Sequence, residues 1–222
     1  MEILRKAMLA MLLLLPLSVL AQNTWEKPEE QKKSQSKSSR NTNKQASEKE
    51  YQYAYYCGDV VPVVNGEVVW EKTYTNTKTV EENYAAMLNY LTAMTKEEGQ
   101  LENSNVSLIN KTEHKIVCHF EEWMVFTNAL LSLDRTRFIY TLIAECRDHQ
   151  VYIKIFRLNY WYEELRDGGF RYKAEEWITD EFALNKKHTR LAKISGKFRR
   201  KTVDRVKEIL DNIAVVIDAK QN

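Results

Sequence analysis

Glycine is scarce in this sequence of 222 residues, with six glycines at positions 58, 66, 99, 168, 169 and 196. The GxGxxG turn of dinucleotide-binding folds and the P-loop both need closely spaced glycines, so neither motif fits these positions. The GxSxG turn of α/β-hydrolases is missing, and so are the HExxH and CxxC patterns of common zinc sites. The sequence therefore predicts no cofactor, no catalytic motif and no motif-based metal site.

Cysteine is scarcer still, with only Cys57, Cys118 and Cys146. Three cysteines allow at most one internal disulfide, which excludes a disulfide-rich scaffold. A long hairpin centred near Ser132 would place Cys118 opposite Cys146, at a Cα separation of about 4.5–5.5 Å that a disulfide can span. The alternative is that all three cysteines are buried free thiols that pack as small hydrophobic residues.

A long apolar run is found only near the N-terminus, where two basic residues precede the segment 8–20. This pattern, which ends in small residues, is typical of a secretory signal peptide, here residues 1–21 with cleavage between Ala21 and Gln22. The run is shorter than the roughly 20 residues of a membrane-spanning helix, and no second such run follows. We therefore expect a periplasmic or secreted protein with no membrane span after cleavage.

Residues 22–50 contain almost no aliphatic side chains and are rich in Ser, Gln, Asn, Lys and Glu. Such a composition buries too little apolar surface to offset the entropy of ordering, so it predicts a disordered polar linker. The remaining residues, 51–222, fit a single domain with 24 basic and 25 acidic residues, a formal net charge of −1. Near neutrality and export together argue against DNA or RNA as a partner, because phosphate neutralisation supplies most of nucleic-acid affinity.

Local signals near the start of this domain predict a hairpin and a helix. Two β-branched runs in VVPVVNGEVVWEKTYT flank Asn65 and Gly66, which suit a two-residue hairpin turn. Thr79 and Glu82 have the spacing of a capping box, which predicts a helix that begins at Val80.

Further along, the apolar period changes to two. It predicts four strands, at 105–110, 115–126, 136–146 and 150–162, with a longer connection over 128–135. Apolar residues at helical spacing then predict an amphipathic C-terminal helix. The expected fold is α+β, an antiparallel sheet of order β-α-β-β-β-β-α with both helices packed on one face.

Four segments carry a resemblance to a known family: GEVVWEKTY, RFIYTLIAECRDHQVYIKIFRLNY, AEEWITDEFALNKK and GKFRRKTVDRVKEIL. Together they resemble a family of exported bacterial domains of unknown function that have a TATA-box-binding-protein-like (TBP-like) fold. The similarity covers about residues 60–217. It implies the architecture expected above but no activity, and the name of the fold implies no DNA binding.

A basic stretch precedes and opens the C-terminal helix. Cations at a helix N-terminus are mildly unfavourable, and an anion bound there would reverse that cost. The stretch is therefore a candidate contact for an anionic ligand or a partner, or it is neutralised within the fold by acidic stretches such as 163–164 or 175–176. The candidate residues are Lys186, Lys187, Lys197, Arg199, Arg200 and Lys201.

Two further clusters were considered as sites. Tyr160, Trp161 and Tyr162 form a candidate recognition surface, or they are ordinary packed strand residues. In CHFEEW, residues 118–123, strand alternation puts His119 and Glu121 on one face and their neighbours on the other, so no metal site is predicted there.

These observations favour a non-enzymatic binding or interaction domain of the cell envelope, whose partner is an envelope protein or an anionic ligand. The contact surface would be the sheet face without helices or the basic stretch. Two alternatives stay open, a small-molecule or lipid pocket between the sheet and the C-terminal helix, and a hydrolase with a site that matches no motif.

Overall fold

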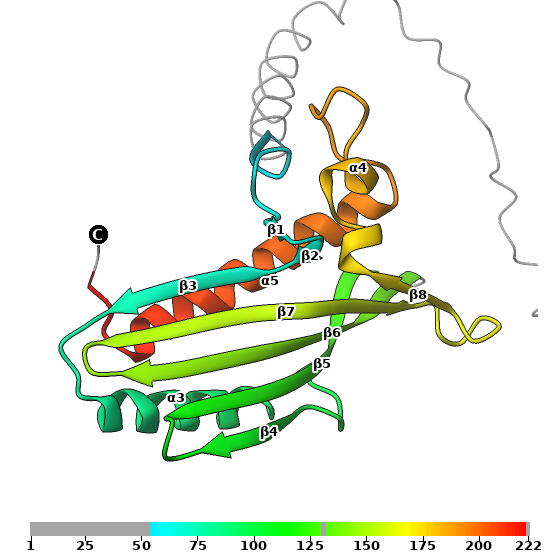
Figure 1. The fold of residues 1–222 in the computed structure, drawn as a ribbon. Helices are drawn as coiled ribbons and strands as arrows, with labels where there is room; N and C mark the ends of the chain where they lie inside the picture. Colours follow the sequence, from blue (N-terminus) through cyan, green and yellow to red (C-terminus); the bar gives the residue numbers. More distant parts are fainter. Residues whose placement is uncertain (1–53, 130–131, 221–222) are drawn as a thin grey trace, which may run out of the picture. The chain divides into compact units, whose positions relative to one another are not determined.

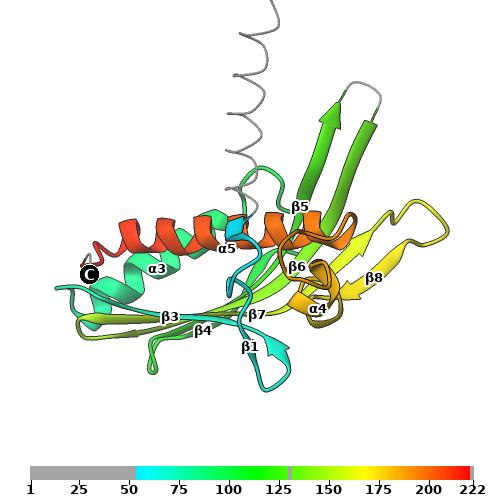
Figure 2. The same ribbon diagram turned by 90° about the horizontal axis from the view of Figure 1, so that it is seen from above.

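The computed structural model describes residues 54–129 and 132–220, which lie in one compact unit. Two long helices, α3 (Val80–Met94) and α5 (Ser195–Val216), cover the same face of an antiparallel sheet (Figures 1 and 2). No helix in the described ranges has both the length and the apolar character needed to cross a membrane. The predicted signal peptide and linker lie outside the described residues.

The centre of the sheet is a meander of four consecutive strands. One further strand pairs with each end of the last of these four strands. The order of the sheet is β3-β7-β6-β5-β4, and β8 pairs with β7 beyond the end of β3. This arrangement confirms the expected α+β fold with four consecutive antiparallel strands and both helices on one face. The strands are β3 (Trp70–Thr75), β4 (Asn105–Asn110), β5 (Lys115–Ala129), β6 (Ser132–Arg147), β7 (Gln150–Tyr162) and β8 (Phe170–Lys173).

The two local signals near the start of the domain are confirmed. β1 (Val63–Val64) and β2 (Glu67–Val68) flank Asn65 and Gly66, whose φ angles of 52° and 85° are those of a type I′ turn. The α3 capping box is complete. Its Thr79 Oγ1 accepts from Glu82 N at 3.3 Å, and Glu82 Oε2 accepts from Thr79 N at 2.8 Å.

The connection expected over 128–135 is wrong, because β5 and β6 continue as paired strands through these residues to the pair Ala129–Ser132. A bulge between Val125 and Thr127 breaks the alternation that sequence reasoning relied on. The hairpin contacts α5 at two points. The Phe126 ring lies 4.6 Å from the Phe198 ring, and Asp134, in the part of β6 that was not expected, lies 2.6 Å from the Lys197 ammonium. The added length is therefore supported by a contact far away in the sequence, and Figure 2 shows the hairpin extending past α5.

The predicted disulfide between Cys118 and Cys146 is also wrong. The register places Cys118 opposite Leu142, whereas the Cys146 amide donates to the carbonyl of His114 at 3.0 Å. The two cysteines are thus offset by four residues along the hairpin, about 13 Å at roughly 3.3 Å per residue. All three cysteines are free, and burial raises the pKa of the Cys118 and Cys146 thiols to about 12.

We expect three thiols per chain to react with a thiol reagent after unfolding without reductant. In the native protein, Cys57 should react readily and the other two slowly, because Cys118 and Cys146 are buried whereas Cys57 is half-exposed. A chromogenic thiol titration measures both quantities. A single reactive thiol after unfolding would show that a disulfide exists despite the register.

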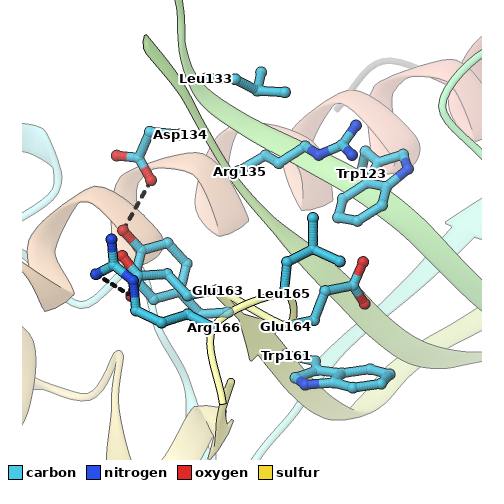
Figure 3. A pocket seen from close by; sticks show the side chains of 10 residues that line it. Trp123, Leu133, Asp134, Arg135, Trp161, Glu163, Glu164, Leu165 and Arg166 are labelled. Carbon is cyan, nitrogen blue, oxygen red and sulfur yellow. Dashed lines mark hydrogen bonds and ion pairs between the residues drawn. The ribbon is translucent and has the colours of Figure 1, made fainter. Parts of the chain in front are cut away.

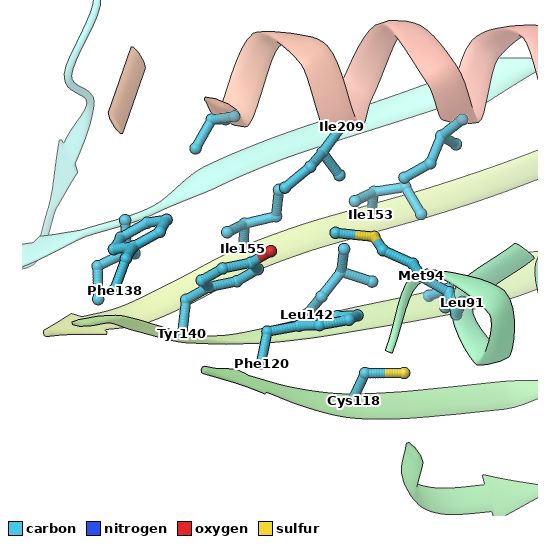
Figure 4. Close-up of a cluster of buried hydrophobic side chains, with 14 of the residues drawn as sticks. Leu91, Met94, Cys118, Phe120, Phe138, Tyr140, Leu142, Ile153, Ile155 and Ile209 are labelled. Atoms are coloured by element: carbon cyan, nitrogen blue, oxygen red, sulfur yellow. The ribbon is translucent and has the colours of Figure 1, made fainter. Parts of the chain in front are cut away.

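The core lies between the two helices and the inner face of the sheet (Figure 4). The ring of Tyr140 lies 5.2 Å from that of Phe120 and 4.8 Å from that of Phe138, and α3 and α5 cover these rings with apolar residues. Buried apolar side chains fill the centre of the space between the sheet and α5, and a cavity of ≈ 380 Å³ lies at its margin, lined by β5 residues such as Glu122 and α5 residues such as Arg205. The buried helix residues include Met87, Leu91 and Met94 of α3, and Phe198, Val203, Val206, Ile209 and Ile213 of α5.

Candidate functional site: a ladder of tryptophan and arginine

The basic stretch does not form one continuous surface, because Arg199 is fully buried. Its guanidinium donates to three backbone carbonyls, those of Tyr56 (2.6 Å), Gly58 (2.9 Å) and Ile178 (2.9 Å). It also forms an ion pair with Asp180 at 2.7 Å. The prediction that Arg199 contacts a partner is therefore wrong, since this side chain ties the start of the domain to α5.

Lys197 is half-buried and is neutralised within the fold. Its ammonium lies 2.6 Å from Asp134 and 3.1 Å from the Tyr162 hydroxyl. Burial alone would lower the pKa of Lys197, but these hydrogen bonds raise it. The neutralising carboxylate is thus Asp134 and not one of the acidic stretches named from the sequence.

The other four basic candidates lie nearer to solvent. Lys186 and Lys187 are exposed in the connection between α4 (Asp180–Ala183) and α5. Arg200 and Lys201 are half-exposed on the first turns of α5. Their role as partner contacts stays a prediction.

The three consecutive aromatic residues of β7 separate onto opposite faces, because side chains alternate along a strand. Tyr160 is buried against α5, where its hydroxyl lies 2.6 Å from that of Thr202, so its predicted recognition role is wrong. Tyr162 also packs on α5, against Phe198. Trp161 points to the face without helices, which we call the open face.

On the open face, tryptophan and arginine alternate across four neighbouring strands. The register pairs Trp123 of β5 with Arg137 of β6, Arg137 with Trp161 of β7, and Trp161 with Arg171 of β8. The Arg137 guanidinium lies 5.4 Å from the Trp123 ring and 4.8 Å from the Trp161 ring. Arg171 lies 3.9 Å from Trp161, and Arg135 lies 3.6 Å from Trp123. We call these five residues the Trp–Arg ladder.

Two carboxylates hold the central arginine of the ladder. Glu121 accepts from Arg137 at 2.8 Å and from Asn103 at 2.6 Å, and Glu164 pairs with the Arg137 Nε. Burial would raise the pKa of Glu121, but the hydrogen bonds from Arg137 and Asn103 outweigh burial and lower it. The end arginines, Arg135 and Arg171, form no ion pair with any carboxylate in the described part of the chain. The centre of the ladder therefore combines one guanidinium with two carboxylates, a formal charge of −1, whereas both ends are cationic.

A cavity of ≈ 580 Å³ lies beside the ladder, between the β5–β6 hairpin and the loop that follows β7 (Figure 3). Two rim leucines are strongly exposed, Leu165 at 95% and Leu133 at 56%. The indole N–H of Trp161 donates to the Gly168 carbonyl at 2.8 Å and so fixes the ring against the loop. The lining residues are Trp123, Leu133, Asp134, Arg135, Trp161, Tyr162, Glu163, Glu164, Leu165 and Arg166.

Gly169 shapes the loop that delivers Glu164 to the ladder. Its φ is 72°, and a Cβ at this position would lie 2.5 Å from the Tyr162 carbonyl oxygen and 2.7 Å from the Glu164 Cα. Only glycine fits so close to the backbone in this conformation. The turn at Gly168 and Gly169 thus positions a side chain of the site.

The expected division of the CHFEEW segment between the two faces is confirmed. Glu121 lies at the ladder, whereas Glu122 faces α5 and accepts two hydrogen bonds from Arg205, each at 2.9 Å. Across the residues that the structure describes, no group of three or more His, Cys, Asp or Glu side chains is placed to hold a metal ion.

Comparisons with known proteins agree with the fold. A sequence model described as "Domain of unknown function (DUF4468) with TBP-like fold" matches residues 72–161. A crystal structure of a DUF4468 family protein from Bacteroides ovatus ATCC 8483 has 32% identity and a TM-score of 0.67, over 74% of this chain and 94% of that chain. No curated protein matches the sequence.

A second crystal structure, of a TBP-like protein from Parabacteroides distasonis ATCC 8503, has a TM-score of 0.59 over 72% of this chain and 99% of that chain. At 20% identity this likeness shows the fold alone. Three ladder strands, β5, β6 and β7, lie within or at the limit of the matched range 72–161, whereas β8 follows it.

Proposed function

The chain belongs to the DUF4468 family of domains of unknown function, and from this premise we propose that it is an exported, non-enzymatic domain that binds a protein partner at the Trp–Arg ladder. The observation that carries the proposal is the ladder itself, with two tryptophans, three arginines and a cavity rimmed by exposed leucines. Tryptophan and arginine are enriched at binding hot spots. Export rests on the N-terminal sequence pattern.

The rim favours a protein partner over a small anion. Leu165 and Leu133 place apolar surface beside the ladder, and the charges around the cavity have both signs. A small anion would gain nothing from the exposed leucines, whereas an apolar side chain of a protein would bury them. The guanidinium groups of the ladder are already held by stacking on the tryptophan rings. Their side chains therefore lose little conformational freedom on binding, which lowers the entropic cost of association.

The carboxylates near the cavity support binding over hydrolysis. Glu121 and Glu164 converge, as the hydrolase alternative requires, but both contact the same arginine. A general acid needs a raised pKa to hold its proton near neutral pH. The pKa of Glu121 is lowered instead, which fits a residue that orients Arg137.

Partner capture with matched variants tests the proposal. We expect Leu165→Ser and Arg135→Ala to weaken binding of a protein captured from the native envelope fraction by at least about tenfold, since truncating a hot-spot residue costs more than about 1.4 kcal/mol. Leu165 is almost fully exposed, so its replacement should leave the fold intact. Val215→Ser, at an apolar position on α5 that is 76% exposed, is the control.

The dissociation constant of the captured protein should be measured directly against all three variants. A partner whose affinity falls with Leu165→Ser and Arg135→Ala and not with Val215→Ser supports the proposal. Affinities that are equal for wild type, Leu165→Ser and Arg135→Ala would remove the ladder as the binding surface.

A further inference from the structure

The two edges of the sheet differ in charge. The β3 edge carries the exposed residues Glu71 and Lys72, and Glu71 pairs with Lys154 of β7 at 3.0 Å. The β4 edge, Asn105–Asn110, has the sequence NVSLIN and contains no charged residue and no proline. Soluble proteins commonly protect an exposed edge strand with charge or proline, because its free N–H and C=O groups can pair with another strand. β4 lacks both of these protections.

β4 also exposes apolar side chains on both faces of the sheet. Leu108 is 46% exposed and Ile109 is 49% exposed. The register pairs Leu108 with Val117 on the open face and Ile109 with Ile116 on the helix side. A strand added to this edge would therefore bury apolar surface on both faces.

The β4 sequence is a near palindrome, which identifies the strand that fits it. Read from its two ends, β4 matches Asn105 with Asn110, Val106 with Ile109, and Ser107 with Leu108. Both asparagines pair with open-face residues of β5, whereas Val106 and Ile109 both lie on the helix side. Strict alternation along β4 would place Val106 and Ile109 on opposite faces of the sheet. They share a face because the β4–β5 register shifts between Val106 and Leu108, which leaves Ser107 without a partner on β5.

We propose that β4 pairs antiparallel with β4 of a second copy of this chain and joins the two sheets edge to edge (Figure 1). In this pairing Asn105 lies opposite Asn110 of the partner copy, and Val106 lies opposite Ile109. In both of these pairs the two residues lie on the same face of the sheet, and no like charges lie opposite each other. A slip of the register by one residue would place open-face residues opposite helix-side residues. Each copy contributes the same surface to this contact, so the two chains form a closed dimer with two-fold symmetry.

This inference does not use the proposed function. β4 pairs with residues 115–119 of β5, whereas the ladder begins at Trp123, beyond the end of β4. The linker composition also makes residues 22–50 a poor alternative occupant, because that segment offers almost no aliphatic or β-branched side chains for the edge.

Sedimentation of the purified full-length protein tests the dimer. We expect the molar mass to rise toward twice that of the chain over about two orders of magnitude in concentration, because dimerisation follows mass action. Leu108→Lys should weaken self-association at least about tenfold, since like charges would come close across the two-fold axis, and Ile109→Lys should do so because it sets a charge against the apolar Val106 of the partner copy. Thr73→Lys, at an exposed position on the β3 edge, is the matched control and should leave the dimer unchanged.

A cross-link tests the register independently of any loss of stability. In the double variant Asn105→Cys/Asn110→Cys, each new cysteine lies opposite one of the partner copy and opposite no cysteine of its own chain, so oxidation should give a covalent dimer on a denaturing gel. Glu71→Cys, on the other edge, should give no covalent dimer under the same conditions. A wild type that stays monomeric at every concentration, a dimer that survives both lysine variants, or a double variant that forms no covalent dimer would each overturn the proposal.

Discussion

Replacing Arg199 by alanine is expected to lower the free energy of unfolding by about 3–5 kcal/mol, as is typical when a buried charged network loses its centre. The substitution leaves the carbonyls of Tyr56, Gly58 and Ile178 without their donor and removes a fully buried side chain. Equilibrium unfolding in denaturant measures the loss. Arg199→Lys should recover only part of it, because one ammonium cannot reproduce the planar donors of a guanidinium.

Arg200→Ala is the matched control for this prediction. Arg200 is the next residue of α5 and is half-exposed, so its removal should change stability by no more than about 0.5 kcal/mol. Equal losses for the two variants would contradict the structural role of Arg199. Loss of partner binding in Arg199→Ala would therefore report unfolding rather than a lost contact.

Replacing Arg137 by alanine is expected to lower the free energy of unfolding by about 3–5 kcal/mol near pH 7, with a smaller deficit at acidic pH. The substitution leaves Glu121, whose side chain is 6% exposed, as a buried carboxylate without its cation. It also removes the ladder residue that both tryptophans share. Unfolding curves at pH 7 and near pH 4.5 measure the change.

The pH dependence follows from the lowered pKa of Glu121 in the native protein. A carboxylate with a lowered folded-state pKa stabilises the fold above its unfolded pKa of about 4.3, and that stability is lost as pH falls through the folded pKa. Without Arg137, Glu121 keeps only the hydrogen bond from Asn103 against burial, so its pKa should rise relative to wild type and the protonated form should be favoured. The variant should therefore recover toward wild type on acidification.

Arg135→Ala is the control for the electrostatic part of this prediction. Arg135 stacks on Trp123 but forms no ion pair with a carboxylate in the described ranges, so its loss should cost about 0.5–1 kcal/mol. That smaller deficit should be the same at both pH values. A deficit of Arg137→Ala that does not change with pH would contradict the role of Glu121.

The fold could be predicted from the sequence because its signals are local. The Asn65–Gly66 turn, the Thr79–Glu82 box and the apolar alternation of β7 each act over a few residues. The pattern of apolar and polar residues along the chain largely decides the fold class. β8 escaped detection because it is four residues long and follows directly on a turn.

The ladder could not be predicted because it depends on register between strands. Bulges in β5 and β7 shift the pairing by one residue each, and the sequence gives no sign of where they lie. The surface role expected for Arg199 is wrong for another reason. Its partners are backbone carbonyls, which any residue could supply, so no side-chain pattern in the sequence indicates them. The alternation of residues 160–162 did carry a usable signal, because it predicts that Trp161 and its neighbours point to opposite faces.

The hydrogen bond from Arg199 to Tyr56 closes a loop of 143 residues along the chain. In a polypeptide synthesised from its N-terminus, Tyr56 cannot make this contact until α5 has followed. Contacts of such long range form late, since the entropy of loop closure opposes them. Completion of the native state thus waits until α5 has been synthesised, so the tie between the two ends of the domain is among the last contacts to form.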